Sequence, residues 1–217
     1  MNDLPRPVAF EGLDARDLVA LFNWLSAVFA APPDRDSVVS YRRGPAAAWL
    51  DGVASLPGCA EAVERMRCAL EAEAEDALVA AQVGAAYGLL FEGVGGPRTV
   101  SPYESVHADG GRLFGAPAAA MDAILAAHDL SVAASAHEAP DHIAVELAAA
   151  ARLLAEGEPD AEAIIARLRG WVPAFAADCA AADANGFWAG AAAVVIAVVG
   201  LATRQSANAE ILGAIKH

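Results

Sequence analysis

Residues 187–203 read FWAGAAAVVIAVVGLAT, a run of 17 residues without a charged side chain. A helix that spans a bilayer needs about 20 apolar residues, and this run is slightly shorter and rich in alanine and glycine. Asp183 and Arg204 lie close to its two ends. We therefore interpret the run as a buried core helix of a soluble protein rather than as a membrane segment.

The composition agrees with a helical core. Hydrophobic residues make up 57% of the 217 residues, above the roughly 45–50% of typical soluble domains. Most of the excess is alanine, which favours helix because it loses no side-chain entropy there. Period-2 alternation of β-branched residues, the pattern of a half-buried strand, is hard to find. The composition predicts an all-α protein.

Caps, prolines and apolar spacing predict about ten helices. The first follows Asp14, carries apolar residues every three or four positions from Leu18 to Phe29, and ends at Pro32-Pro33. The other expected helices cover 36–44, 45–54, 59–91 with a break near Glu75-Asp76, a short stretch after Pro102, 117–128, 141–157, 158–175, 187–203 and a last one from Ser206. The loops 92–102 and 131–140 are candidate hinges.

The charge balance restricts the partners. Fourteen basic and 28 acidic residues give a net charge of −14. Such a surface repels nucleic acid and anionic lipid, whose binding depends on clustered Lys and Arg. It attracts a basic partner, although an acidic surface also simply keeps a protein soluble. We interpret the acidic run between Glu71 and Asp76 as a solvated helix face.

The cysteines and the N-terminus indicate a cytoplasmic location. Three cysteines without a C-x-x-C pair argue against a disulfide framework and for a reducing compartment. Residues 1–14 lack the basic-then-apolar pattern of a secretory signal peptide.

The segment 137–147, HEAPDHIAVEL, is the densest cluster of titratable residues. In the zinc helix H-E-x-x-H the two histidines lie four positions apart and reach one ion. Here His137 and His142 lie five apart with Pro140 between them, so we predict no metal site. His142 and Glu146 are one helical turn apart, a spacing found in general-base pairs and more often in surface or capping pairs.

No specific enzyme signature accompanies this cluster. The glycines of 92–102 fit neither a dinucleotide nor a P-loop pattern, and no G-x-S-x-G is present. We therefore predict no catalytic residues and no cofactor. A nucleotide hydrolase using the 137–147 carboxylates is a weak rival interpretation.

Three segments in order resemble a known family. Tyr87-Gly-Leu-Leu-Phe91 with the glycines that follow, then Ser101-Pro-Tyr-Glu-Ser105, then Glu138-Ala-Pro-Asp-His-Ile-Ala-Val-Glu-Leu147 resemble the Y-x-x-L-F-x-G, P-Y-E-S and E-P-D-D-H-[IL]-x-x-E-L motifs of TorD/DmsD-type chaperones. Gly170-Trp171 and Phe187-Trp188 fit the order of later aromatic segments. The sequence departs from the family at Ala139 and Pro140, and in the four alanines after Leu147.

The resemblance spans essentially the whole chain and implies one helical domain, 1–217, without catalysis. It implies a cytoplasmic chaperone for a molybdenum-cofactor enzyme. Such a chaperone binds the twin-arginine signal peptide of the catalytic subunit, or its apo form, assists insertion of the molybdopterin cofactor and holds back premature export. A helical assembly factor that binds no signal peptide is the alternative. The chaperone is expected to be a monomer or a domain-swapped dimer.

The resemblance also implies signal-peptide contacts. Asp141 is expected to pair with an arginine, and His142 to donate or accept a hydrogen bond beside it. Glu104 suits the basic end of the signal, and Tyr103 offers it an aromatic face. The full set of expected binding residues is Asp141, His142, Glu104, Tyr103, Glu138, Glu146 and Tyr87.

Structural roles remain open for several of these residues. Asp141 and Glu104 can be helix caps. Tyr87 and the nearby Phe91 can belong to the core, as we expect for Trp24 and Trp49.

Overall fold

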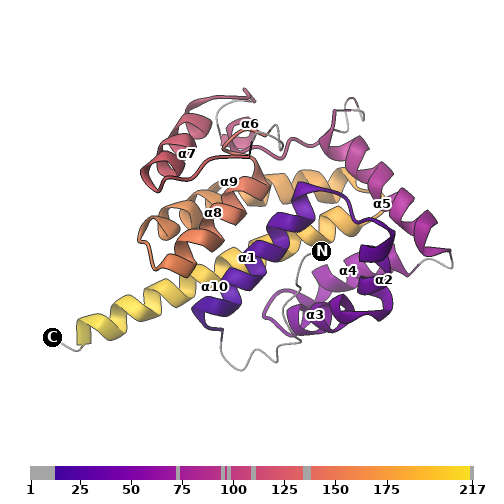
Figure 1. Cartoon of the computed structure of the whole chain (residues 1–217), viewed down its shortest axis with the longest axis horizontal. Coiled ribbons are helices and arrows are strands. Elements are labelled where there is room, and N and C mark those ends of the chain that lie inside the picture. Colours follow the sequence, from indigo (N-terminus) through magenta and orange to yellow (C-terminus); the bar gives the residue numbers. More distant parts are fainter. Residues whose placement is uncertain are drawn as a thin grey trace.

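The part of the chain that the computed structural model describes contains ten α-helices and no β-strand (Figure 1). This part comprises residues 13–71, 74–93, 96, 99–108, 111–133 and 138–215, with 206–215 described by their backbone only. One isolated antiparallel bridge joins Tyr103 to His142. The predicted all-α class and the predicted number of helices are confirmed.

The first helix, α1 (Ala15–Ala30), forms as its sequence predicts. Asp14 caps it by accepting hydrogen bonds from the N–H groups of Arg16 (2.7 Å) and Asp17 (2.9 Å), and Asp17 accepts one from the N–H of Asp14 in return (3.0 Å). This reciprocal pair is a capping box. The predicted apolar stripe from Leu18 to Phe29 is buried, so α1 faces the core along its whole length.

The remaining helices are α2 (Arg35–Arg43), α3 (Pro45–Ala54), α4 (Ala60–Leu70), α5 (Asp76–Phe91), α6 (Glu104–Ala108), α7 (Ala116–Ala127), α8 (Ile143–Glu156), α9 (Asp160–Ala182) and α10 (Phe187–Ile215). Apart from α9 and α10, they end close to the expected positions. Gly157 ends α8 in the left-handed conformation, φ 72°, which glycine adopts without steric cost.

Two of the helix predictions were wrong in extent. We expected one helix to end at Thr203 and another to begin at Ser206, but α10 continues without a break to Ile215. Similarly, α9 continues beyond Phe175 to Ala182 and contains Pro173. Alanine supplies five of the seven residues from 176 to 182 in the α9 extension, and alanine has the highest helix propensity.

The uncharged run 187–203 is a core helix, as predicted. Phe187–Gln205 is long and apolar enough to cross a membrane by length and composition, yet 61% of its most apolar window is buried inside the protein. It packs against α4 and α9. The approach to α4 is close, because a Cβ atom on Gly190 would lie 2.6 Å from the carbonyl oxygen of Ala62.

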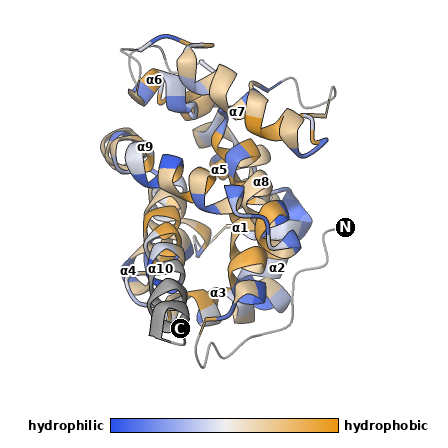
Figure 2. Ribbon diagram, turned by 90° about the vertical axis from the view of Figure 1, so that its left-hand side faces the viewer, coloured by the Kyte–Doolittle hydropathy of each residue, from blue (hydrophilic) through white to orange (hydrophobic). Residues whose placement is uncertain are grey.

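Helices α1, α8, α9 and α10 pack against one another and form the centre of the bundle (Figure 1). Trp24 and Trp49 are buried in the core as expected, with ring centroids 6.0 Å apart. Both views show α6 and α7 at one end of the bundle, beside α8 and α9 (Figures 1 and 2). This end contains the segments that resemble the family motifs.

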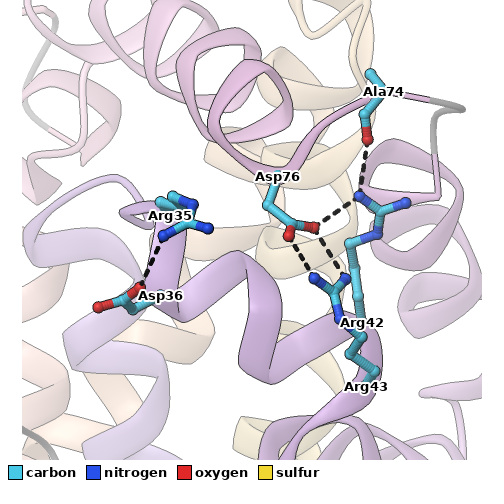
Figure 3. A network of polar contacts seen from close by, with 6 residues as sticks. All are labelled: Arg35, Asp36, Arg42, Arg43, Ala74 and Asp76. Atoms are coloured by element: carbon cyan, nitrogen blue, oxygen red, sulfur yellow. Dashed lines mark hydrogen bonds and ion pairs between the residues drawn. The ribbon is translucent and has the colours of Figure 1, made fainter.

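The acidic run at 71–76 is only partly a solvated face. Asp76 accepts hydrogen bonds from Arg42 (2.8 Å) and from Arg43, and Arg42 also donates to the carbonyl of Ala74 at 3.0 Å (Figure 3). The guanidinium of Arg43 lowers the pKa of Asp76. The prediction was wrong for Asp76, because its partners come from α2, more than 30 residues away. Residues 72 and 73 lie outside the described part.

The predicted hinges at 92–102 and 131–140 also lie partly outside the described residues, which omit 94–95, 97–98 and 134–137. Their hinge role therefore stays a prediction, as does the extent of the domain over residues 1–217.

Candidate functional site

Two segments about 40 residues apart in the sequence are joined at the start of α8. The N–H of Glu104 donates to the carbonyl of Asp141 (3.0 Å), and the N–H of Ile143 donates to the carbonyl of Pro102 (2.8 Å). These bonds flank the bridge between Tyr103 and His142. The P-Y-E-S and P-D-H segments thus form one local structure.

Asp141 lies at the centre of this junction and is fully buried. Its Oδ2 accepts a hydrogen bond from the N–H of Ser105 at 2.9 Å, at the start of α6. Asp141 is therefore a capping residue, but it caps α6 and not α8, the helix that follows it in the sequence. That helix, α8, begins two residues later than predicted, at Ile143.

His142 is the N-cap of α8. Its Nδ1 accepts a hydrogen bond from the N–H of Ala144 at 3.2 Å, and 3% of the residue is exposed. Burial lowers the pKa of His142, while the carboxylates of Glu138 and Asp141 act in the opposite direction. The ring is consequently neutral at pH 7, which agrees with Nδ1 acting as an acceptor.

Glu138 and Tyr103 adjoin the His142 ring. The hydroxyl of Tyr103 donates to Oε2 of Glu138, and the same oxygen lies 4.0 Å from Nε2 of His142. The rings of Tyr103 and His142 meet edge to face at 5.0 Å. Burial and the hydrogen bond to Glu138 raise the pKa of Tyr103, so its hydroxyl stays protonated. The Glu138 side chain is 32% exposed and is therefore partly accessible to solvent.

Glu104 and Glu146 face the interior and share Arg167 of α9. The Arg167 guanidinium donates to Glu104 and lies 3.6 Å from Oε1 of Glu146. The indole N–H of Trp171 donates to the other oxygen of Glu146 at 3.0 Å. Burial is the main cause that raises the pKa of Glu146 well above 4.5. This buried network ties α6 and α8 to α9.

Tyr87 is a core residue, the alternative that its sequence left open. It is 8% exposed, and its hydroxyl donates to the carbonyl of Phe29 at 3.2 Å. Its ring lies 5.0 Å from that of Trp188. Burial raises the pKa of Tyr87 to about 12, and Glu138 and Glu92 add to this effect. Tyr87 thus lies beneath the cluster of Tyr103, Glu138 and His142.

A groove of about 380 Å³, here called the α8 groove, opens beside this cluster. Its wall is mainly apolar and includes Leu125, Leu130, Val132, Val145 and Ala148. Glu138 and His142 contribute polar atoms to it, and so does Arg152, whose guanidinium pairs with Glu156 at 2.7 Å. The groove can therefore take an apolar segment that has a hydrogen-bonding or cationic end.

The sequence-based prediction missed Arg167, Trp171 and the groove residues on α1 and after α7. Arg167 and Trp171 are distant in sequence from the glutamates that they bind, and a single arginine on a helix carries no local signal for such pairing. Within the described part, which excludes His137, no group of three His, Cys, Asp or Glu residues is placed to hold a metal ion.

Comparison with known proteins identifies the family. The family model of the nitrate reductase delta subunit matches residues 55–179, which is more than half of the chain and contains both segments of the junction. Chaperone protein TorD of Vibrio cholerae serotype O1 (strain M66-2) is 27% identical over 193 residues, 82% of this chain and 87% of that protein. Chaperone protein TorD of Photobacterium profundum is 27% identical over 194 residues, 82% of this chain and 88% of that protein. The chain therefore belongs to the nitrate reductase delta subunit family, the family of the TorD-type chaperones.

Proposed function

We propose that this protein is a cytoplasmic chaperone that matures a molybdopterin-dependent oxidoreductase by binding the twin-arginine signal peptide of its catalytic subunit, its apo form, or both. By holding the signal, it delays export until the cofactor has been inserted. The protein itself performs no catalysis in this proposal and holds no cofactor. The relatives named TorD support the chaperone role.

The observation that carries the proposal is the α8 groove with Glu138 at its edge. A twin-arginine signal has a basic start and an apolar middle, so a receptor needs an anionic edge beside an apolar wall. Glu138 supplies a partly exposed carboxylate, and the groove supplies the wall. The net charge of −14 adds long-range attraction for the basic start.

The expected binding residues then have different roles. We propose that Glu138 pairs with a signal arginine, and that neutral His142 accepts or donates one hydrogen bond in the groove. Tyr103 orients Glu138 and offers the edge of its ring. Asp141 contributes by fixing the start of α6 beside His142.

The remaining three residues support this surface from behind. In the proposal Glu104 and Glu146 act through Arg167, which fixes α6 and α8 against α9. Tyr87 supports Tyr103 and Glu138 from the core.

A peptide titration tests the proposal. A labelled peptide with two arginines followed by an apolar stretch is titrated against the wild-type chain, alongside the same peptide with two glutamines. Ala148→Phe fills the groove from an exposed position of α8, and Ala180→Phe on α9 is the matched control at an exposed alanine outside the groove. We expect Ala148→Phe to weaken binding by about tenfold or more and the control to leave it unchanged.

Two outcomes would overturn the signal-peptide part of the proposal. One is no binding of the twin-arginine peptide to the wild type. The other is that the wild type and Ala148→Phe, whose groove is filled, bind the twin-arginine peptide with equal affinity. Capture of the client enzyme with its leader deleted, together with no peptide binding, would favour the alternative of a general assembly factor.

A further inference from the structure

A second cavity, of about 650 Å³, lies between the end of α1 and the start of α2, and we call it the α2 cavity. Three aromatic side chains line it: Trp24, Tyr41 and Phe187. The indole N–H of Trp24 donates to the hydroxyl of Tyr41 at 2.9 Å, and the rings of Tyr41 and Phe187 lie 6.3 Å apart. The aromatic lining is therefore held in place by its own contacts.

The polar part of this lining is made of oxygen atoms. Asp34, Asp36, Ser37 and Ser40 contribute to it, and among the described residues that line the cavity there is no lysine or arginine. Hydrogen bonds from Ser37 lower the pKa of Asp34, so this carboxylate is ionised at neutral pH. The cavity thus combines anionic oxygens with aromatic rings, which suits a guanidinium or ammonium group.

Asp36 is available to a ligand. Its side chain is 90% exposed, and its ion pair with the exposed Arg35 is long, at 4.0 Å (Figure 3). Exposed pairs of this kind contribute little free energy. A cation from another molecule can therefore replace Arg35 beside Asp36 at small cost.

Helix α1 contributes residues to both the α2 cavity and the α8 groove. Ala30 lines the groove, whereas Ala27, about one helical turn earlier, and Ala31, the next residue, line the cavity. All three alanines are exposed. Their methyl groups are small, so the backbone of an extended segment can cross α1 here in close contact.

We propose that the α8 groove and the α2 cavity are two halves of one binding site for an extended segment of the client protein. Apolar residues of the segment occupy the groove, the chain crosses α1 over Ala27, Ala30 and Ala31, and a cationic residue enters the α2 cavity between the carboxylates and the aromatic rings. This inference rests on the proposed function and extends it, because it assigns a second cationic position beyond Glu138.

The test compares two variants of the cavity with a control. Ala27→Arg places a guanidinium of the chain itself beside Asp34 and Asp36, and arginine keeps α1 intact because its helix propensity is close to that of alanine. Asp36→Asn removes one charge from an exposed position. Ala177→Arg makes the same charge change as Ala27→Arg at an exposed position of α9 that lines neither cavity. Thermal denaturation of each variant confirms folding.

Both peptides of the previous titration are used. For the twin-arginine peptide we expect about tenfold weaker binding with Ala27→Arg and about threefold weaker binding with Asp36→Asn at low salt. The weak residual binding of the twin-glutamine peptide should not change with Asp36→Asn, because that peptide has no cation for the cavity, whereas Ala27→Arg also obstructs the path over α1 and can weaken the binding of both peptides. Ala177→Arg should match the wild type.

The outcomes separate this inference from the proposed function. If the wild type binds neither peptide, both the proposed binding of the signal peptide and the two-part site are wrong. If the wild type binds the twin-arginine peptide and Ala148→Phe weakens that binding, while Ala27→Arg and Asp36→Asn do not, only the two-part site is wrong. Equal weakening of both peptides by Asp36→Asn would also overturn it, since the effect would then not depend on the cation.

Discussion

The carboxylate of Asp141 accepts a hydrogen bond from the backbone N–H of Ser105, and both residues are fully buried. The bond connects the residue before the N-cap of α8 to the first turn of α6. Because both partners lie away from water, the bond contributes mainly to the stability of the junction. Substitutions of Asp141 therefore affect folding as well as binding.

Removing this carboxylate should destabilise the protein. Asp141→Ala leaves the buried N–H of Ser105 without an acceptor, which costs about 1–3 kcal/mol in the free energy of unfolding. Asp141→Asn keeps an oxygen that can accept the bond and should cost less. Urea denaturation measures both values. Equal stability of the alanine variant and the wild type would contradict the assigned role.

The network around Arg167 predicts a larger effect. Arg167→Leu leaves the buried carboxylate of Glu104 without its cation and removes the guanidinium beside Glu146, whose pKa burial already raises. Loss of one partner of a buried ion pair costs about 3–5 kcal/mol. The same change in a chain that already carries Glu104→Gln and Glu146→Gln should cost much less, because no buried charge is left unpaired. Similar costs in both chains, measured by urea denaturation, would show that Arg167 acts through packing alone.

The helix boundaries could be predicted from the sequence because their causes are local. The capping box of Asp14 and Asp17, Pro45 at the start of α3, and Gly157 after α8 all act within one helical turn. The continuation of α10 past Ser206 was missed, since a single serine is only a weak signal for the end of a helix. Neighbouring helices that cover the first part of α10 outweigh such a signal.

The candidate site was predictable in its residues but not in their arrangement. The segments holding Glu104 and Asp141 were identified, yet which helix Asp141 caps depends on the fold that brings Ser105 to it. The exposed fractions also differ among the acidic residues, since Glu146 is fully buried while Glu138 reaches solvent. The spacing of Glu138 and Glu146 in the sequence does not show which of the two side chains the fold buries.

Two glycines of α10 should respond to alanine in opposite directions. In Gly190→Ala the new Cβ would lie 2.6 Å from the carbonyl oxygen of Ala62 and 2.7 Å from Cγ of Met66. Such overpacking costs about 1–3 kcal/mol. In Gly200→Ala the new Cβ meets only the guanidinium of Arg204, at 3.6 Å, so higher helix propensity should stabilise the protein by about 0.5–1 kcal/mol. Shifts of the same sign in thermal denaturation would contradict the close packing of α10 on α4.

Phe114 stores strain in the loop before α7. Its φ of 61° lies in the left-handed region, and it is 75% exposed, so little burial offsets the strain. Phe114→Asn should stabilise the fold by about 0.5–1 kcal/mol, because asparagine tolerates this conformation better. Leu113→Asn is the control, since Leu113 is also half exposed but has no positive φ. A gain for Leu113→Asn equal to that for Phe114→Asn would attribute the effect to lost surface hydrophobicity instead.

Salt should weaken peptide binding, and Glu138 should account for a measurable part of that dependence. The net charge of −14 attracts a basic peptide over long range, and this attraction is screened within about 10 Å at 0.1 M salt. The affinity of the wild type for the twin-arginine peptide should therefore fall steadily as sodium chloride rises from about 0.05 to about 0.5 M.

Glu138→Gln keeps the size of the side chain and removes its charge, so binding should be about three- to tenfold weaker at low salt, with a smaller difference at high salt. Glu64→Gln makes the same change at an exposed residue of α4 that lines neither cavity, and it controls for net charge. If the salt dependence is flat, the acidic surface takes no part in binding. If Glu138→Gln and Glu64→Gln respond alike, the attraction comes from the overall charge, and Glu138 makes no direct pair with an arginine.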